Sequence, residues 1–280
     1  MRVEIDPGSG FCGGVIRAIG TAEEHLRREG ALYSLGAIVH NEEELSRLEA
    51  EGLVAVDKSD LGPAGDISTV LIRAHGEPPE VYGRVRDLGY SLIDCTCPVV
   101  LKIQKSIREA SGRVLIFGKH GHPEVLGLVG QTVGAAVFEN MEQLRELVPS
   151  LDPSLDYDLF SQTTKDPLEY EKACTLLGAV LPNLTVHRTI CHQVASRHRL
   201  LSEFAAAHDA VVFVSGKDSS NGKVLCELCR SVNPRTYHIG SPEEIRPEWF
   251  AGASSVGVCG ATSTPKWLLE KVAAWIENLQ

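Results

Sequence analysis

The sequence predicts an α/β protein made of three repeated small units with mostly parallel sheets. Two observations indicate this fold class. Strand-like and helix-like runs alternate along the chain, which is typical of parallel sheets covered by helices. The same order also recurs three times: a cysteine, a helical run, and two strands that each end in a polar loop. The cysteines Cys12, Cys97 and Cys191 lie 85 and 94 residues apart, and this period fits small domains rather than a solenoid.

Length and composition fit this organisation. The 280 residues suffice for about two ordinary domains or about three small ones, and 43% hydrophobic residues is a globular composition. A net charge of −10 argues against a nucleic-acid binder. Apolar runs stay far below the roughly 20 residues of a membrane span, and the acidic start is unlike a signal peptide. We therefore expect a cytoplasmic protein without a membrane partner, whose eight cysteines serve metal binding, catalysis or burial rather than disulfides.

Each unit is expected to start at or near its cysteine. The bounds are 13–96, 97–189 and 190–280, with 1–12 as an N-terminal segment that reaches the centre. In the first unit, a strand and a glycine-rich turn precede Cys12, and helically spaced apolar residues follow it. Later strands end at the polar loops of His40 and His75. The next helices start at Asn41, a typical N-cap residue, and at Pro78-Pro79, because proline favours a first turn.

The second and third units repeat this order. The strands before their polar loops are expected at 114–117, 158–160, 211–214 and 256–258. Each cysteine and each polar loop follows a strand and precedes a helix. Ligands bind beyond the carboxyl ends of parallel strands. Three such units around a pseudo-three-fold axis would form a trefoil that brings three cysteines and six polar loops to one centre.

Three thiolates from three units can hold several kinds of metal centre. Zinc bound by three cysteines usually takes a histidine as fourth ligand. An iron–sulfur cluster on three thiolates leaves one iron free for a substrate. Each cysteine lies just before a helix, whose positive end favours a thiolate. The alternative is three buried cysteines at strand ends, but burial does not explain a repeat.

The polar loops predict an anion site. Hydroxyls, amides and imidazoles at helix starts bind anions together with backbone N–H groups. The candidates are His40, His75, His122, Ser219, Ser220, Asn221 and Ser263. Asn41, Ser219 and Ser263 are equally compatible with ordinary helix caps. Glu124 is a carboxylate available for proton transfer, and its alternative is a surface glutamate.

The remaining cysteines fit the repeat less well. Cys226 and Cys229 share a helix face, and no second pair follows at zinc-finger spacing, so we expect both to be buried. Cys174 and Cys259 have no visible partners in the sequence, although Cys259 lies near a polar loop. Cys95 is expected to be a buried neighbour of Cys97.

Nine short motifs carry a resemblance to a known family. They cover residues 10–15, 39–41, 74–76, 96–98, 121–125, 162–164, 190–191, 219–221 and 263–265. In this order, over nearly the whole chain, they resemble the 4-hydroxy-3-methylbut-2-enyl diphosphate reductases, which catalyse the last step of the methylerythritol phosphate route to isoprenoids. One departure is Val194, where many members carry threonine, and another is Cys95, where a residue without a thiol is more usual.

The resemblance implies a trefoil around a 4Fe–4S cluster held by Cys12, Cys97 and Cys191. The free iron would bind the substrate hydroxyl, which leaves as water to give isopentenyl and dimethylallyl diphosphates. Glu124 would donate a proton, with Thr163 beside the reacting carbon. The diphosphate would be held by His40, His75, His122, Ser219, Ser220, Asn221 and Ser263. Electrons would come from ferredoxin or flavodoxin.

Three other functions compete with this one. A lyase such as quinolinate synthase also has three α/β units and three cysteines, but needs no external electrons. An iron–sulfur redox sensor would need no anion-binding loops, and a zinc enzyme would be colourless. An acidic electron donor would require a basic patch. Its candidates, which are equally compatible with solvated helix faces, are Arg17, Lys102, Lys105, Arg197 and Arg199.

Overall fold

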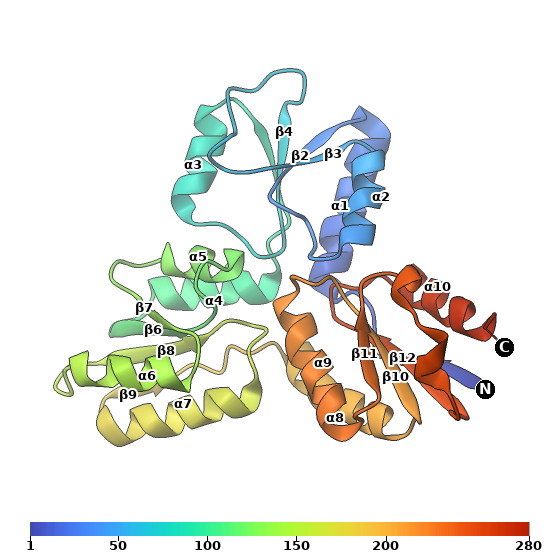
Figure 1. The fold of residues 1–280 in the computed structure, drawn as a ribbon. Coiled ribbons are helices and arrows are strands. Elements are labelled where there is room, and N and C mark those ends of the chain that lie inside the picture. The colour runs from blue at the N-terminus through green and yellow to red at the C-terminus, as the bar shows by residue number, and fades with distance from the viewer. Residues whose placement is uncertain (280) are drawn as a thin grey trace. The chain divides into compact units, whose positions relative to one another are not determined.

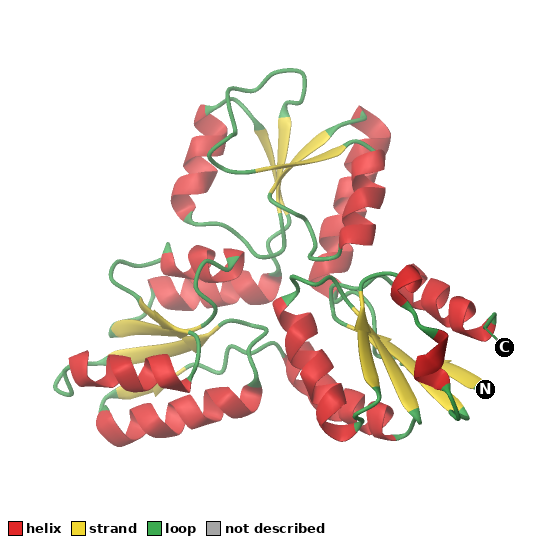
Figure 2. Ribbon diagram, in the orientation of Figure 1, coloured by secondary structure: helices red, strands yellow, loops and turns green. Residues whose placement is uncertain are grey.

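The chain contains three four-stranded sheets, which confirms the predicted fold class (Figure 1). The structure is a computed structural model that describes residues 1–279. Every strand pair with a defined register is parallel. Helices cover both faces of the second and third sheets (Figure 2), as is typical of parallel sheets.

The first sheet has the order β3-β2-β4-β5. Its strands are β2 (Leu32–Leu35), β3 (Leu53–Val56), β4 (Thr69–Ile72) and β5 (Ser91–Asp94). The helices along this part of the chain are α1 (Gly13–Glu29), α2 (Glu42–Ala50) and α3 (Pro79–Asp87). As predicted, α2 starts after Asn41, whose side chain accepts a hydrogen bond from the Glu44 N–H. Pro79 is the first residue of α3.

The second sheet has the order β7-β6-β8-β9. Its strands are β6 (Arg113–Phe117), β7 (Ala136–Phe138), β8 (Tyr157–Ser161) and β9 (Leu184–Val186), and its helices are α4 (Pro98–Arg108), α5 (Pro123–Val129), α6 (Met141–Leu147) and α7 (Pro167–Val180). Successive residues of β6 enter different cores. Leu115 and Phe117 pack with residues of α6 and α7, whereas Val114 and Ile116 pack with residues of α4 and α5. This two-sided burial explains the continuous apolar run.

The third sheet has the order β1-β12-β10-β11. Its strands are β1 (Arg2–Ile5), β10 (Ala210–Val214), β11 (Thr236–Ile239) and β12 (Ser255–Gly260), and its helices are α8 (His192–Ala206), α9 (Ser220–Val232) and α10 (Lys266–Glu277). The described residues also contain three short 3₁₀ helices, Val148–Ser150, Pro242–Glu244 and Pro247–Phe250. The sequence pattern did not predict β11 and α6, because their short runs carry neither a cysteine nor one of the polar loops that mark the repeat.

The three sheets share one strand order, but the third draws its edge strand from the other end of the chain. In the first two sheets the fourth strand along the chain lies at the edge and leads to a cysteine, β5 to Cys97 and β9 to Cys191. In the third sheet β1 occupies that place beside β12 and leads to Cys12 (Figure 1). The N-terminal segment therefore completes the last sheet.

The described chain divides into two compact units. Unit 1 comprises Met1–Leu32, Gly36–Ala55 and the residues from Gln193 onward, and unit 2 comprises Tyr33–Leu35 and Val56–His192. The predicted domain bounds of 13–96, 97–189 and 190–280 stay a prediction. Among residues 1–279, none of the helices has the length and apolar character that crossing a membrane requires.

Candidate functional site

The three cysteines of the repeat occupy equivalent places in the fold. Cys12 is the N-cap residue of α1, Cys97 is the N-cap residue of α4, and Cys191 directly precedes α8. All three are half-buried and lie outside any disulfide bond. Each can therefore present its sulfur atom at a helix N-terminus, where negative charge is favoured.

A repeated backbone hydrogen bond ties each cysteine to a polar loop. The N–H of each cysteine donates to a carbonyl of the loop that follows the neighbouring strand. The pairs are Cys12 with Thr262 (3.2 Å), Cys97 with Ala74 (3.0 Å) and Cys191 with Thr163 (3.0 Å). Each of these carbonyls belongs to a predicted site residue or to its direct neighbour. The repeat read from the sequence is thus also a repeat of hydrogen bonding.

Glu124 and Thr163 form a buried pair in unit 2. The Thr163 N–H donates to Oε1 of Glu124 and the Thr163 hydroxyl donates to Oε2, both at 2.7 Å. The carboxyl group of Glu124 is buried, with 2% of the residue exposed. Burial raises the pKa of Glu124 to about 7, although the two Thr163 hydrogen bonds favour the charged form. A carboxyl group with a pKa near neutrality is suited to proton transfer. The alternative of a surface glutamate is wrong.

The raised pKa of Glu124 should make stability depend on pH. The folded protein holds a proton that the unfolded chain releases, so the free energy of unfolding falls as the pH rises from about 4.5 to about 7. Relative to Glu124→Gln, which cannot titrate, wild type should lose about 3 kcal/mol over this window. Denaturant unfolding of both proteins at pH 5 and pH 8 measures the difference.

Glu142→Gln is a matched control for that measurement. Glu142 is the second residue of α6, as Glu124 is of α5, but it is exposed. The control variant should keep the pH dependence of wild type. Parallel pH dependences of wild type and Glu124→Gln would contradict the proposed titration.

Two predicted histidines lie beside this pair in unit 2. The rings of His75 and His122 meet edge to face with centroids 5.4 Å apart. Nδ1 of His122 accepts a hydrogen bond from the Glu124 N–H at 3.2 Å, which caps α5. Together with the backbone bonds of Cys97 and Cys191, these contacts connect six predicted site residues of unit 2.

The serine and asparagine loops meet in unit 1. The hydroxyl oxygens of Ser219 and Ser263 lie 3.2 Å apart, and Nδ2 of Asn221 donates to the hydroxyl of Thr262 at 2.9 Å. Ser219 also caps α9 by accepting from the Gly222 N–H. Ser219 therefore both caps a helix and belongs to a polar cluster. Ser220, the first residue of α9, is half-buried.

Thr262 and Gly216 are two further residues of these loops that the sequence pattern did not predict. Thr262 pairs with both Asn221 and the Cys12 N–H, and its adjacency to Ser263 was the available signal. Gly216 lies against the backbone of the His40 loop. A Cβ at Gly216 would collide with the carbonyl group of His40.

Gly216→Ala should disturb the His40 loop. The new methyl group has to displace a backbone carbonyl, and overpacking of this kind typically costs about 1–3 kcal/mol. Gly20→Ala is the matched control, because its added methyl group meets open space on helix α1. That control should be neutral or stabilising. Thermal unfolding of both variants tests this, and equal stability of Gly216→Ala and wild type would contradict the assigned close approach.

The other cysteines are buried in the cores or away from the polar loops. Cys95, Cys226, Cys229 and Cys259 are each at most 2% exposed. Burial raises the pKa of Cys259 well above its ordinary value and that of Cys226 to about 11. Burial also raises the pKa of half-buried Cys174. The expected burial of Cys95 and of the 226–229 pair is confirmed. Val194 is also buried.

One residue of the proposed basic patch is misassigned. Arg197 is buried, and its Nη2 forms an ion pair with Oδ2 of Asp6 at 2.6 Å and donates to the Ser9 hydroxyl at 2.8 Å. It therefore holds the segment before Cys12 within unit 1 and is unavailable to a protein partner. Arg199 is exposed and pairs with Glu203 on its own helix.

Comparisons with known proteins identify relatives over the full length of the chain. A model of the LytB protein family matches residues 3–277. A 4-hydroxy-3-methylbut-2-enyl diphosphate reductase of Bacteroides fragilis is 46% identical, covering 99% of this chain and 98% of its own. The protein of that name from Chlorobium chlorochromatii is 42% identical, with coverage of 99% and 96%.

Solved structures agree with these sequence relatives. A structure of (E)-4-hydroxy-3-methyl-but-2-enyl diphosphate reductase, described as the terminal enzyme of the non-mevalonate pathway, matches with 31% identity and a TM-score of 0.73, covering 99% of this chain and 100% of that one. The E-1-hydroxy-2-methyl-but-2-enyl-4-diphosphate reductase of Plasmodium falciparum shares the fold, with 23% identity and a TM-score of 0.88 over 98% of this chain and 87% of its own.

Proposed function

The chain belongs to the LytB protein family, and on that premise we propose that it reduces (E)-4-hydroxy-3-methylbut-2-enyl diphosphate to isopentenyl and dimethylallyl diphosphates. In this reaction the allylic C–O bond breaks, the hydroxyl group leaves as water, and two electrons and two protons are consumed. The observation that carries the proposal is the buried Glu124, whose raised pKa allows it to hold a proton near neutral pH. Dehydroxylation needs such a donor, because hydroxide is a poor leaving group.

The cysteines of the repeat fit a 4Fe–4S cluster with three protein ligands. Cys12, Cys97 and Cys191 are half-buried, lie outside any disulfide bond and occupy equivalent helix starts, whereas four of the other five cysteines are buried. When bound, such a cluster supplies electrons and a Lewis-acidic iron. The chain's own part is to hold it through thiolates. Because the reaction consumes electrons, a reductant is required, and we assign this role to a ferredoxin or flavodoxin.

The polar loops are suited to holding the diphosphate. In unit 1, Ser219, Ser220 and Asn221 lie at the start of α9, and His40 directly precedes the N-cap residue of α2. In unit 2, His122 caps α5. Ser263 and His75 lie in the loops that lead to α10 and α3. Backbone N–H groups and helix dipoles stabilise phosphate at such positions. Fixed donors orient the allylic group for reaction. Thr163 holds the Glu124 carboxyl group in place through two hydrogen bonds.

Anaerobic reconstitution with iron and sulfide tests the proposal directly. The expected result is a brown protein with iron–sulfur absorption that converts the hydroxy-diphosphate to both products when given a chemical reductant. Turnover without a reductant would favour a lyase instead. A colourless active protein with one bound zinc would favour a zinc enzyme.

A further inference from the structure

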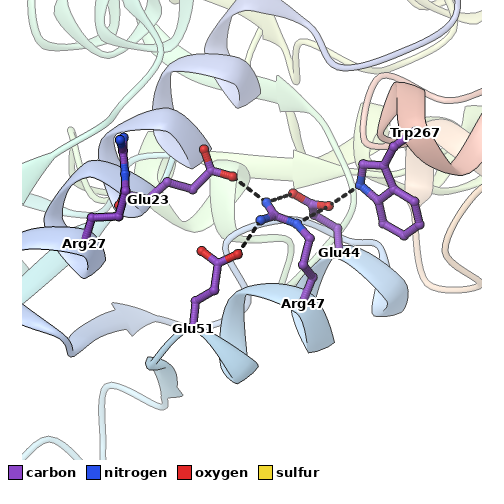
Figure 3. Close-up of polar contacts among 6 residues, drawn as sticks. All are labelled: Glu23, Arg27, Glu44, Arg47, Glu51 and Trp267. Carbon is purple, nitrogen blue, oxygen red and sulfur yellow. Dashed lines mark hydrogen bonds and ion pairs between the residues drawn. The ribbon is translucent and has the colours of Figure 1, made fainter.

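A group of charged residues outside the polar loops joins three helices of unit 1 (Figure 3). We call it the Glu44 cluster. It consists of five residues. Glu23 lies on α1, Glu44 and Arg47 lie on α2, Glu51 is the C-cap residue of α2, and Trp267 lies on α10. Nη2 of Arg47 bonds to Glu23 at 2.6 Å, and Nη1 bonds to Glu51 at 2.8 Å. One guanidinium group therefore faces three carboxylates.

Glu44 is the buried member of this cluster, with 1% of the residue exposed. Arg47 donates two hydrogen bonds to the Glu44 carboxylate, from Nη2 to Oε1 at 2.6 Å and from Nε to Oε2 at 3.1 Å. The hydrogen bond with Glu44 holds the pKa of Arg47 above its ordinary value. The indole N–H of Trp267 donates to the same Oε2 of Glu44 at 2.8 Å. A buried carboxylate with three donors is firmly oriented.

The two ends of the Glu44–Trp267 bond stand beside two of the anion-binding loops. Glu44 lies in the first turn of α2, and its N–H is capped by Asn41, the residue after His40. Trp267 is the second residue of α10, four residues after Ser263. The bond thus links the helix that follows the His40 loop to the helix that follows the Ser263 loop, across 223 residues of sequence.

A second contact supports the same linkage. The His40 carbonyl lies against Gly216, and Ser219 in that loop meets Ser263. The Ser219 loop therefore contacts both the His40 loop and the Ser263 loop within unit 1. The Glu44–Trp267 bond adds a direct link between the helices that follow the His40 and Ser263 loops. Thr264, the residue after Ser263, anchors the Ser263 loop, because its buried hydroxyl donates to the Val214 carbonyl at 2.7 Å.

We propose that Glu44 is a positioning residue for diphosphate binding, which acts through its hydrogen bond to Trp267 by holding the His40 loop in register with the Ser263 loop. This inference rests on the proposed function, because it assigns the loops to the diphosphate. It concerns binding, whereas the Glu124–Thr163 pair concerns the chemical step. Removing the bond should therefore raise KM and leave kcat nearly unchanged.

The variant Trp267→Phe tests this, because it removes the indole N–H and keeps an aromatic ring. Trp275→Phe is the matched control, since Trp275 is an exposed tryptophan on the same helix. The anaerobically reconstituted proteins are compared by steady-state turnover of the hydroxy-diphosphate. Calorimetric titration with inorganic pyrophosphate gives a second readout that needs no turnover. For Trp267→Phe we expect KM and the pyrophosphate Kd to rise about fivefold to tenfold, with kcat within about twofold of wild type.

Glu44→Ala provides a double-mutant cycle, because alanine removes the acceptor of the Trp267 indole N–H. Its own effect on pyrophosphate Kd should be at least as large as that of Trp267→Phe. Adding Trp267→Phe to Glu44→Ala should raise the Kd little further, because both substitutions remove the same bond. Fully additive effects, or a Trp267→Phe protein that binds pyrophosphate like wild type, would overturn the inference.

The outcome for the proposed function is separate. A wild-type protein that binds no pyrophosphate would overturn the inference, because the loops would hold no diphosphate to be positioned. A wild-type protein that binds pyrophosphate but does not reduce the hydroxy-diphosphate would contradict the proposed function. In that case the pyrophosphate affinities still decide the role of Glu44.

Discussion

Glu124→Gln is expected to lower kcat by about 10²- to 10⁴-fold, the usual contribution of a positioned general acid. Glutamine keeps the size of the side chain and one acceptor for Thr163, so the loop should hold its shape. It carries no carboxyl proton to deliver to a departing hydroxyl group. The burial that raises the pKa of Glu124 to about 7 also means that no water can easily take its place.

The measurement is steady-state reduction of the hydroxy-diphosphate with a chemical reductant. Iron content, absorption spectrum and pyrophosphate affinity should match wild type, which separates a lost proton donor from a lost cofactor or binding site. Glu142→Gln, the exposed counterpart at the same helix position, should retain full activity. Full turnover by Glu124→Gln would remove Glu124 from the reaction.

The fold was largely predictable because its strands and loops repeat. Apolar runs such as Val114–Phe117 and Val211–Val214 are buried on both sides of their sheets, and each run is followed by its polar loop. The pairing of β1 with β12 was not predictable from local pattern. It joins Val3 to Val256, and nothing in the spacing of either strand specifies the partner. The pairing of strands that are far apart in the sequence is therefore set by the packing of the whole sheet, not by the local pattern of either strand.

The candidate site was predictable in its residue types but not in all its contacts. Glu124 and Thr163 were found from short motifs near strand ends, and the structure pairs them. Arg197 was misread because its partner Asp6 lies at the other end of the chain. Glu44 and Trp267 were missed for the same reason, since a single side-chain hydrogen bond between distant residues leaves no periodic signal in a sequence.

Cys97→Ser is expected to lose the intact cluster, whereas Cys95→Ser should keep it. Cys97 is half-buried at the start of α4, and its N–H is bonded to Ala74 beside His75. Cys95 still follows the line of β5, with its N–H donating to the Ile72 carbonyl at 2.8 Å, and its side chain is 2% exposed. The first position fits a ligand and the second fits a core residue.

The pair of variants separates loss of a ligand from loss of stability. Cys95→Ser replaces a buried thiol with a more polar hydroxyl group and should lower the free energy of unfolding by about 1–3 kcal/mol, with iron content and absorption unchanged. Cys97→Ser removes a thiolate from a half-buried position, so its iron content and iron–sulfur absorption should fall. Before reconstitution, the free energy of unfolding of this variant should be close to that of wild type. Iron analysis and absorption after identical anaerobic reconstitution measure this. An intact cluster in Cys97→Ser with a lost one in Cys95→Ser would reverse the assignment, and Cys95 would then be the ligand of the second repeat.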